Sequence, residues 1–272
     1  MNPVVPFKLK PGTAAFYRHV MECLAEAKVP FLLGGTYAFE VYTDVGGATK
    51  DLDIFLKGSD LKGALEALEG CGYQTSVHSP HWIAKVRDGK EVVDLIFNSG
   101  NGMCPVDDGW FRHARPAEVL GQQVRIVPVE EMIWQKSFIQ ERERFDGADV
   151  LHLIRVHGRT LDWERLVDRF GANWPVLLAH LVLYDYVYPS LRDRVPTAVL
   201  EELVGRIGLA ARSSTEERVC NGTVLSRAQY LPDVEELGFI DGRLKQTGGP
   251  LSRQAVRFET ERLRRELQNG EH

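Results

Sequence analysis

Apolar and polar positions follow two different rhythms along the chain. Up to about residue 128, short apolar runs separated by glycine, proline and acidic residues predict a mixed α/β region, because buried strands are short and are bounded by turn-forming residues. Asp88-Gly89 lies between two alternating stretches and predicts a hairpin over residues 81–97. We expect further strands over residues 31–35, 50–57 and 122–129, and helices over residues 12–29, 36–44 and 59–72.

From residue 129 onwards, apolar residues recur at helical spacing instead. The segment over residues 129–158 has one interruption, near Asp146-Gly147, and the charged final residues predict a terminal helix. We therefore expect an α+β fold in two parts: residues 1–128 with a small mixed sheet flanked by helices, and residues 129–272, mostly helical. Further helices are expected over residues 161–171, 174–192 and 197–208.

Composition and charge narrow the class of protein. The 272 residues are 44% hydrophobic and 26% charged, which is enough apolar material for a core, and the formal net charge of -5 gives no global basic surface of the kind that binds nucleic acid. A local basic patch and a nucleic-acid substrate remain open. The sequence has no signal-peptide pattern and no apolar stretch of membrane-spanning length, so we expect a cytoplasmic protein without a membrane partner.

The four cysteines, Cys23, Cys71, Cys104 and Cys220, form no CxxC pair and have no Cys/His spacing suited to zinc. Free thiols are the expected state in a reducing cytosol. The sequence therefore predicts neither a disulfide nor a zinc site.

Two acids stand in a stretch that otherwise has the pattern of a buried strand. Side chains alternate along a strand, so Asp51 and Asp53 share one face of residues 50–57 while Leu52 and Ile54 share the other. Two carboxylates so close together repel each other unless a cation lies between them. Ligands that are all oxygen favour Mg²⁺, which binds through a few carboxylates together with substrate phosphates.

A third acid, Asp94, interrupts a strongly apolar run, and an ionised carboxylate in a buried strand is costly unless it is paired or bound to metal. If its strand neighbours that of Asp51 and Asp53, three carboxylates converge. Each pattern taken alone is also explained by the edge or end of a strand with a satisfied hydrogen bond. Because both follow a strand, a Gly-Gly pair and a helix, we favour a metal site.

Gly34 and Gly35 follow an apolar run and precede the helix expected from Thr36. Glycine lets backbone approach a ligand closely, and a helix N-terminus presents unpaired N–H groups and a positive dipole. This order predicts a seat for phosphate, with Thr36 in a capping-type position. A strand that ends in glycine is common, so the prediction depends on the acids downstream.

The order of these features resembles the nucleotidyltransferase superfamily with the DNA polymerase β-like fold, whose pattern is hG[GS], then DxD, then a third acid. "TKDLDIF" and "EEMIWQKSFIQERERFDGADVLHL" are similar to motifs of the AbiEii-type nucleotidyltransferases and their bacterial relatives, over roughly residues 31–153. The resemblance implies a catalytic domain over residues 1–128 and a helical domain over residues 129–272 that completes the cleft. It also implies two Mg²⁺ ions, with Mn²⁺ as a substitute, and a nucleoside triphosphate such as ATP.

Roles for individual residues follow from the same resemblance. Asp51 and Asp53 would ligate both metal ions, and Asp94 would complete the site beside the attacking hydroxyl. Relatives often carry an arginine at the position of Gly47, and Lys50 is the candidate replacement. The residues implied to bind the nucleotide are Gly34, Gly35, Thr36, Lys50 and Lys136.

The helical half contributes the remaining candidates. Lys136 would share a helix face with Gln140 and Arg144, because residues three or four apart are neighbours on a helix, and a solvated face is the alternative explanation. Asp146 and Asp149 match the family's final acidic pair, with Arg142 or Arg144 as its basic neighbour, and helix capping around Gly147 is the alternative. Arg144, Asp146 and Asp149 would contact the residues that bind the substrate rather than the substrate itself.

The expected activity is transfer of a nucleoside monophosphate from a nucleoside triphosphate to a hydroxyl acceptor, with release of pyrophosphate. The sequence does not choose among three acceptor classes: a small molecule, a protein side chain and a tRNA 3′ end. The resemblance also implies an antitoxin as a possible protein partner. A non-catalytic nucleotide-binding or regulatory module of the same fold is the alternative. Lys85 and Arg87 of the expected hairpin are interpreted as an exposed edge rather than as part of a cleft.

Overall fold

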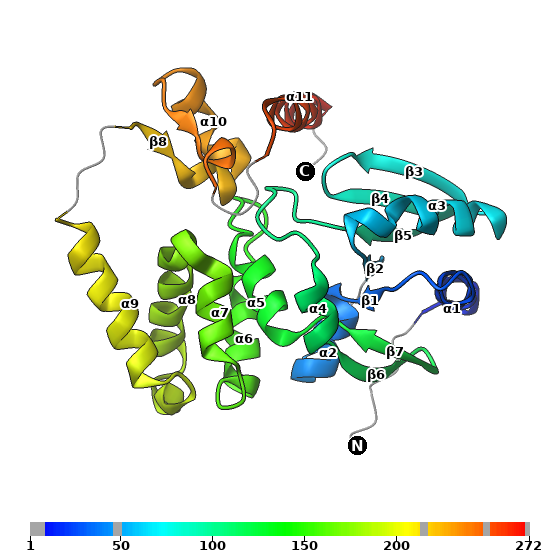
Figure 1. Cartoon of the computed structure of the whole chain (residues 1–272), viewed down its shortest axis with the longest axis horizontal. Helices are drawn as coiled ribbons and strands as arrows, with labels where there is room; N and C mark the ends of the chain where they lie inside the picture. The colour runs from blue at the N-terminus through cyan, green and yellow to red at the C-terminus, as the bar shows by residue number, and fades with distance from the viewer. Residues whose placement is uncertain (1–8, 46–50, 213–216, 247–250, 270–272) are drawn as a thin grey trace. The chain divides into compact units, whose positions relative to one another are not determined.

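A computed structural model describes residues 9–45, 51–212, 217–246 and 251–269 of the chain (Figure 1). The chain divides into two compact units. The first contains Met1–Gly100 and Cys104–Pro128, and the second contains Asn101–Met103 and Val129–His272. The catalytic role expected for residues 1–128 and the cleft-completing role expected for residues 129–272 stay predictions.

A seven-stranded mixed sheet, in the order β3-β4-β5-β2-β1-β7-β6, forms the framework of the first unit. β2 runs parallel to β5 and β1 runs parallel to β7, while the other neighbouring pairs are antiparallel. The expected mixed sheet flanked by helices is therefore confirmed. The strands are β1 (Leu32–Leu33), β2 (Leu52–Phe55), β3 (Gln74–Ser79), β4 (Ile83–Asp88), β5 (Glu91–Ile96), β6 (Arg115–Val119) and β7 (Gln122–Ile126).

Helices pack on this sheet through apolar stripes. Phe16, Val20 and Leu24 recur every fourth residue on α1 and are buried, as expected for an amphipathic helix. α1 contacts α3 and β5, α3 also contacts β3, and α2 contacts β2 (Figure 1). The helices of this unit are α1 (Pro11–Glu26), α2 (Gly35–Thr43), the 3-10 helix η1 (Gly58–Asp60), α3 (Leu61–Gly70) and α4 (Asp108–His113).

The hairpin expected over residues 81–97 is confirmed, with a small shift of its turn. Asp88 pairs with Glu91, so the turn residues are Gly89 and Lys90, and Gly89 supplies the left-handed backbone with φ +58°. β3 and β6 lie outside the predicted strands. Both are edge strands with mostly polar, exposed side chains, and β6 contains Pro116, so the apolar alternation of a half-buried strand is missing.

The thiol prediction is wrong for two of the four cysteines. Cys23 on α1 and Cys71 at the C-cap of α3 form a disulfide, with 6.6 Å between their Cα atoms and 48 residues between them in the sequence. Cys104 and Cys220 carry free thiols. Nothing in the local spacing indicated the pair, because packing of α1 on α3 brings the two sulfur atoms together. Among the described residues, no helix is both long and apolar enough to cross a bilayer.

The second unit is mostly helical, as expected. α8 contacts α5, α6, α7 and α9 and is apolar on all sides, although Val182, Leu183 and Tyr186 on its outer face are exposed (Figure 1). The predicted helix over residues 174–192 is interrupted, since Pro189 follows Tyr188 and disfavours helical backbone there. The bundle helices are α5 (Val129–Ser137), α6 (Gly147–His157), α7 (Trp163–Phe170), η2 (Gly171–Asn173), α8 (Trp174–Val187), η3 (Pro189–Arg194) and α9 (Thr197–Ala210).

The last part of the second unit is smaller and contains a buried ion pair. Arg243 is 1% exposed and donates hydrogen bonds from Nε and Nη2 to the carboxylate of Asp241, the shortest being 2.7 Å. β8 runs parallel to β9 beside it. The elements are β8 (Val219–Cys220), η4 (Asn221–Val224), α10 (Arg227–Glu235), β9 (Ile240–Asp241), η5 (Gly242–Leu244) and the expected terminal helix α11 (Arg253–Asn269).

Candidate active site

Two of the three predicted acids lie side by side on the sheet. β2 and β5 are parallel neighbours, and their register places Asp53 opposite Asp94. Paired residues of neighbouring strands point to the same face, so both carboxylates project from one side of the sheet. Both side chains are partly exposed, while Leu52 and Val93, the preceding pair, are buried on the other face. The alternation predicted for these strands is therefore confirmed.

Asp51 lies in a bend directly before β2, where it is exposed, rather than inside a strand as predicted. Its charge nevertheless acts in the same place as the other two acids. Burial, followed by the charges of Asp51, Glu91, Asp53 and Asp94, raises the pKa of the Tyr17 hydroxyl to about 12. Tyr17 is fully buried on α1, and the charges of all three predicted acids act on its phenol.

The Gly-Gly turn is built directly against Asp53. The N–H of Gly34 donates to the carbonyl oxygen of Asp53 at 3.0 Å, and Gly35 has the left-handed φ of +55°. A Cβ on Gly35 would come within 1.8 Å of Oδ2 of Asp53, and a Cβ on Gly34 would come within 2.2 Å of the ring of Phe55. Both positions therefore need glycine, Gly35 for its conformation as well as for the space it leaves to the carboxylate.

The helix after this turn begins one residue earlier than predicted. α2 starts at Gly35 with Gly34 as N-cap, and no side chain caps its first turn, so Thr36 is not the capping residue. The first N–H groups of a helix lack partners within the helix and carry partial positive charge. The N-terminus of α2 thus lies beside Asp53, where backbone donors face the same region as the carboxylate.

Lys85 joins the acids, contrary to its interpretation as an exposed edge residue. It pairs with Asp94 across β4 and β5, and its Nζ lies 2.9 Å from Oδ1 of Asp94. The two side chains are only 22% and 14% exposed. Lys85 provides a counter-ion, so the burial of Asp94 does not by itself require a metal ion. Arg87, two residues on, is exposed as predicted.

A separate group of charges in the second unit contains the other predicted residues. The Nζ of Lys136 lies 2.8 Å from Asp146 and 2.6 Å from Asp149, and Arg144 donates twice to Asp146 at 3.0 Å. Burial alone would raise the pKa of Asp146, but hydrogen bonds and charges from Arg144 and Lys136 hold it below its ordinary value. The alternative of a solvated lysine is wrong, because the Lys136 side chain is 13% exposed. Asp146 is the N-cap residue of α6, as the capping alternative expects, although its side chain makes no capping hydrogen bond.

Lys136, Gln140 and Arg144 do not share one helix face, contrary to the prediction. α5 ends at Ser137, and Gln140 pairs with Phe145 in an isolated antiparallel bridge before α6 begins. Arg144 therefore returns to Lys136 through a loop rather than along a helix. The remaining nucleotide-binding prediction, Lys50, lies outside the described residues, as does Gly47.

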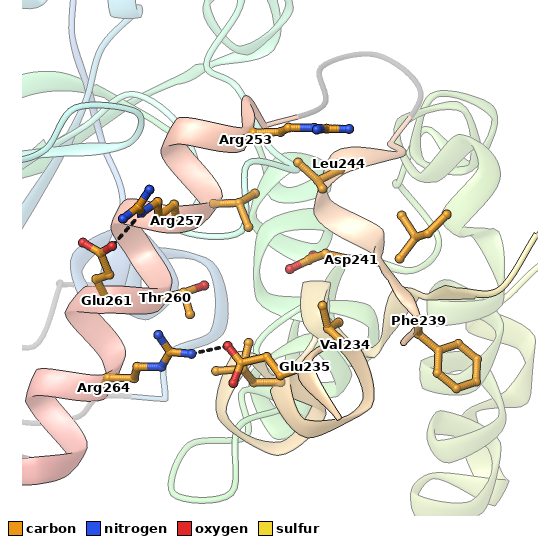
Figure 2. A pocket seen from close by; sticks show the side chains of 13 residues that line it. Val234, Glu235, Phe239, Asp241, Leu244, Arg253, Arg257, Thr260, Glu261 and Arg264 are labelled. Atoms are coloured by element: carbon orange, nitrogen blue, oxygen red, sulfur yellow. Dashed lines mark hydrogen bonds and ion pairs between the residues drawn. The ribbon is translucent and has the colours of Figure 1, made fainter. Parts of the chain in front are cut away.

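A cavity of about 510 Å³ lies in the last part of the second unit, between α10, β9, η5 and α11 (Figure 2). Its walls include Val234 and Leu244, and its edge carries arginines. Arg264 of α11 reaches to Glu235 of α10, and Arg257 pairs with Glu261 on its own helix (Figure 2). None of the described residues that were predicted for the active site lines this cavity.

Three solved structures are among those to which this chain is similar. The antibiotic-resistance factor ANT(2″)-Ia is 13% identical with a TM-score of 0.42 and covers 68% of this chain and 97% of its own. The lincosamide antibiotic adenylyltransferase LnuA is 15% identical with a TM-score of 0.38 and covers 54% and 98%. JHP933 from Helicobacter pylori is 12% identical with a TM-score of 0.36 and covers 75% and 98%.

A protein-family model gives the decisive comparison. The model described as "uncharacterised nucleotidyltransferase" matches residues 14–183, which is more than half of the chain and includes both the acids of the first unit and the Lys136 group. No curated protein matches the chain by sequence. The narrower resemblance to the AbiEii-type enzymes is not confirmed and stays a prediction. The chain belongs to this family of nucleotidyltransferases.

Proposed function

We propose that the protein is a Mg²⁺-dependent enzyme that transfers a nucleoside monophosphate from a nucleoside triphosphate to a hydroxyl acceptor and releases pyrophosphate. One observation carries the proposal: the register of β2 and β5 pairs Asp53 with Asp94, and the Gly-Gly turn before α2 lies against the Asp53 carboxylate. Acids and turn come from separate parts of the sequence. Their meeting at one place is what two-carboxylate metal chemistry with a phosphate substrate requires.

The residues present fit a divalent ion with oxygen ligands. The space beside Oδ2 of Asp53 exists because Gly35 has no side chain, since a Cβ there would come within 1.8 Å of that oxygen. Burial raises the pKa of Tyr17, and the charges of Asp51, Glu91, Asp53 and Asp94 add to this shift. The carboxylates of Asp51, Asp53 and Asp94 would hold the ions, and Mg²⁺ prefers such donors, with Mn²⁺ as the nearest substitute. Bound Mg²⁺ neutralises phosphate charge and lowers the pKa of an acceptor hydroxyl.

Side chains and backbone groups of the first unit would orient the catalytic acids and the triphosphate. Lys85 holds one oxygen of Asp94 at 2.9 Å and thereby fixes the carboxylate that would face the attacking hydroxyl. Gly35 and Thr36 would offer backbone N–H groups to the triphosphate at the start of α2, and Gly34, whose own N–H donates to the carbonyl oxygen of Asp53, would shape the turn beside it. Positioning and charge neutralisation of this kind account for most of the catalysis in phosphoryl-type transfers.

Lys50 and Lys136 are proposed to contact the triphosphate as well. Lys136 is held by Asp146 and Asp149, and Arg144 holds Asp146, so these three residues would fix the ammonium in place. The helical second unit is proposed to complete the cleft and to carry the acceptor side. The acceptor classes are a small molecule, a protein side chain and a tRNA 3′ end, and an antitoxin would be a protein partner.

Binding and transfer are tested in two steps. Thermal shift with ATP, CTP, GTP and UTP, with and without Mg²⁺, should give stabilisation by at least one triphosphate only when metal is present. Incubation with each triphosphate labelled at its α-phosphate, together with total tRNA, a protein extract or aminoglycosides, should then give label transfer. Asp53→Asn and Asp94→Asn should abolish transfer, whereas Asp88→Asn, an exposed acid at the end of β4, should not.

Two results would contradict the proposal. Triphosphate binding that needs no divalent metal, without label transfer to any acceptor, would support the non-catalytic module instead. Full transfer by a folded Asp94→Asn protein would remove Asp94 from the active site while leaving the family assignment intact.

A further inference from the structure

A cluster of sulfur and nitrogen groups lies on the first unit. Cys23 follows His19 by one turn of α1, so both project from one helix face, and Cys71 at the C-cap of α3 meets them from the neighbouring helix. One ligand atom from each residue, two sulfurs and an imidazole nitrogen, lies within 4.8 Å of the others. None of these residues belongs to the proposed active site.

The surroundings of His19 fix which nitrogen faces the sulfurs. Its Nδ1 lies 2.5 Å from the hydroxyl oxygen of Tyr73, while Nε2 lies 3.7 Å from Sγ of Cys23. When Nδ1 carries the ring proton and donates it to Tyr73, the lone pair of Nε2 is free to bind a metal. Metal-binding histidines in proteins are usually oriented by such a hydrogen bond from the other ring nitrogen.

We propose that the reduced form of this cluster binds one Zn²⁺ ion through Sγ of Cys23, Sγ of Cys71 and Nε2 of His19. Two thiolates and an imidazole are donors that zinc prefers, and three protein ligands leave a fourth tetrahedral position for water. The Asp51, Asp53 and Asp94 group offers only carboxylate oxygens and suits Mg²⁺. The first unit would thus hold two cation sites of different chemical preference.

The disulfide and the zinc site are alternative states of the same two sulfurs. A phosphine reductant converts the disulfide to two thiols: phosphorus gives up two electrons and becomes the phosphine oxide, while water supplies the oxygen and two protons. Zn²⁺ then displaces the proton of each thiol and releases two protons to solvent. In the reverse direction, hydrogen peroxide takes two electrons from the two thiolates and two protons from solvent, which leaves the disulfide, free Zn²⁺ and two water molecules.

Either state joins α1 to α3. The disulfide does so covalently, and a shared zinc ion would preserve the link where disulfides are reduced. α1 also carries Tyr17, the phenol that senses the predicted active-site acids. The link would therefore hold in place the helix that lies behind the proposed active site under both reducing and oxidising conditions.

The test uses the full chain reduced with a phosphine and titrated with Co²⁺ in excess Mg²⁺, so that oxygen sites are already occupied. Co²⁺ bound by thiolates gives an intense charge-transfer absorption that carboxylate-bound Co²⁺ lacks. We expect this band at one Co²⁺ per chain, its loss on adding one Zn²⁺, and its absence from the oxidised protein. The matched control is Cys220→Ser, a substitution of a free cysteine outside the cluster, which should leave the band unchanged.

Variants locate the site. Cys23→Ser and Cys71→Ser should each remove most of the band, and His19→Gln should weaken Co²⁺ binding by at least about 10-fold. His19 is exposed, so its substitution is not expected to impair folding and tests the site even if a cysteine variant misfolds. Absence of the band from reduced wild-type protein, or its full retention in His19→Gln and in Cys23→Ser/Cys71→Ser, would overturn the proposal.

Discussion

Two groups of carboxylates, one in each unit, differ in the cations that contact them. In the second unit, Lys136 and Arg144 face Asp146 and Asp149, and the pKa of Asp146 lies below its ordinary value because these cations outweigh burial. In the first unit, Lys85 pairs with Asp94, and burial, followed by the charges of Asp51, Glu91, Asp53 and Asp94, raises the pKa of Tyr17. Two cations thus contact the acids of the second unit, while the acids of the first unit act on a neighbouring phenol.

The difference shows what each arrangement is suited for. Removing one member of a buried ion-pair group leaves a buried charge poorly paired, which destabilises the fold. Acids that lie close together repel one another, and such places are typical of binding and catalytic sites. Substitutions of the acids in the first unit should therefore lower transfer more than stability, whereas substitutions in the Lys136 group should lower stability as well as transfer.

The largest effect is expected from Asp53→Asn. Transfer should fall by at least about 10²–10³-fold, the range for losing one preorganised electrostatic contact in a transition state. Stability without metal should stay the same or rise, because one of the mutually repelling charges is gone. Rates with the labelled triphosphate and urea unfolding without Mg²⁺ measure the two quantities. A clear loss of stability would mean that Asp53 is a structural acid like Asp146.

Gly35→Ala introduces both backbone strain and a steric clash with Asp53, and a control glycine variant separates the two effects. Left-handed backbone costs a residue with a side chain about 1–2 kcal/mol, and the added Cβ would also displace the Asp53 carboxylate. We expect lower stability and loss of transfer.

Gly89→Ala is its matched control. Gly89 has φ +58°, but a Cβ added there would meet no neighbouring atom within 4 Å, so this variant should show the strain without loss of transfer. Equal effects of the two alanines on stability and on rate would show that the space beside Asp53 has no special role.

Lys136→Met tests the Lys136 group. The side chains of Lys136 and Asp146 are 13% and 10% exposed, so removing the ammonium should cost about 1–3 kcal/mol of unfolding free energy, with Arg144 still bound to Asp146. Lys245→Met breaks the exposed pair with Glu217 in the same unit and should cost less than about 1 kcal/mol. Denaturant unfolding compares them, and equal losses would argue against a structural role for the Lys136 group.

Alkaline pH gives the smallest expected effect. Burial is the main cause that raises the pKa values of Tyr17 and Tyr37 in the folded state, so the folded protein keeps protons that the unfolded chain loses. Stability should therefore fall as the pH rises from about 10 to about 12, with Tyr17 responsible for part of the loss. Tyr17→Phe should reduce this loss. Asp53→Asn should reduce it in part, since burial is the larger cause. Unfolding measured across this range checks both, and an unchanged slope in Asp53→Asn would separate that acid from Tyr17.

Sequence patterns predicted the elements that meet at the acids, because apolar alternation and a Gly-Gly pair are local signals. Lys85 was misplaced because its contact depends on the register between β4 and β5, which one strand's sequence does not specify. Arg144 was placed on a helix because helical spacing continues past Ser137, where the chain instead forms a loop and a bridge. The Cys23–Cys71 pair depends on how two helices pack, and no local pattern encodes that.

The turn at Gly35 also bears on how relatives can be sorted. A side chain at that position would occupy the room of the Asp53 carboxylate and would require a backbone that most residues avoid. The family pattern hG[GS] also admits serine at this position, so a relative with serine there should have a different turn backbone or a differently placed acid. The residue at this one position can therefore indicate, before any protein is purified, which relatives share the turn geometry of this chain.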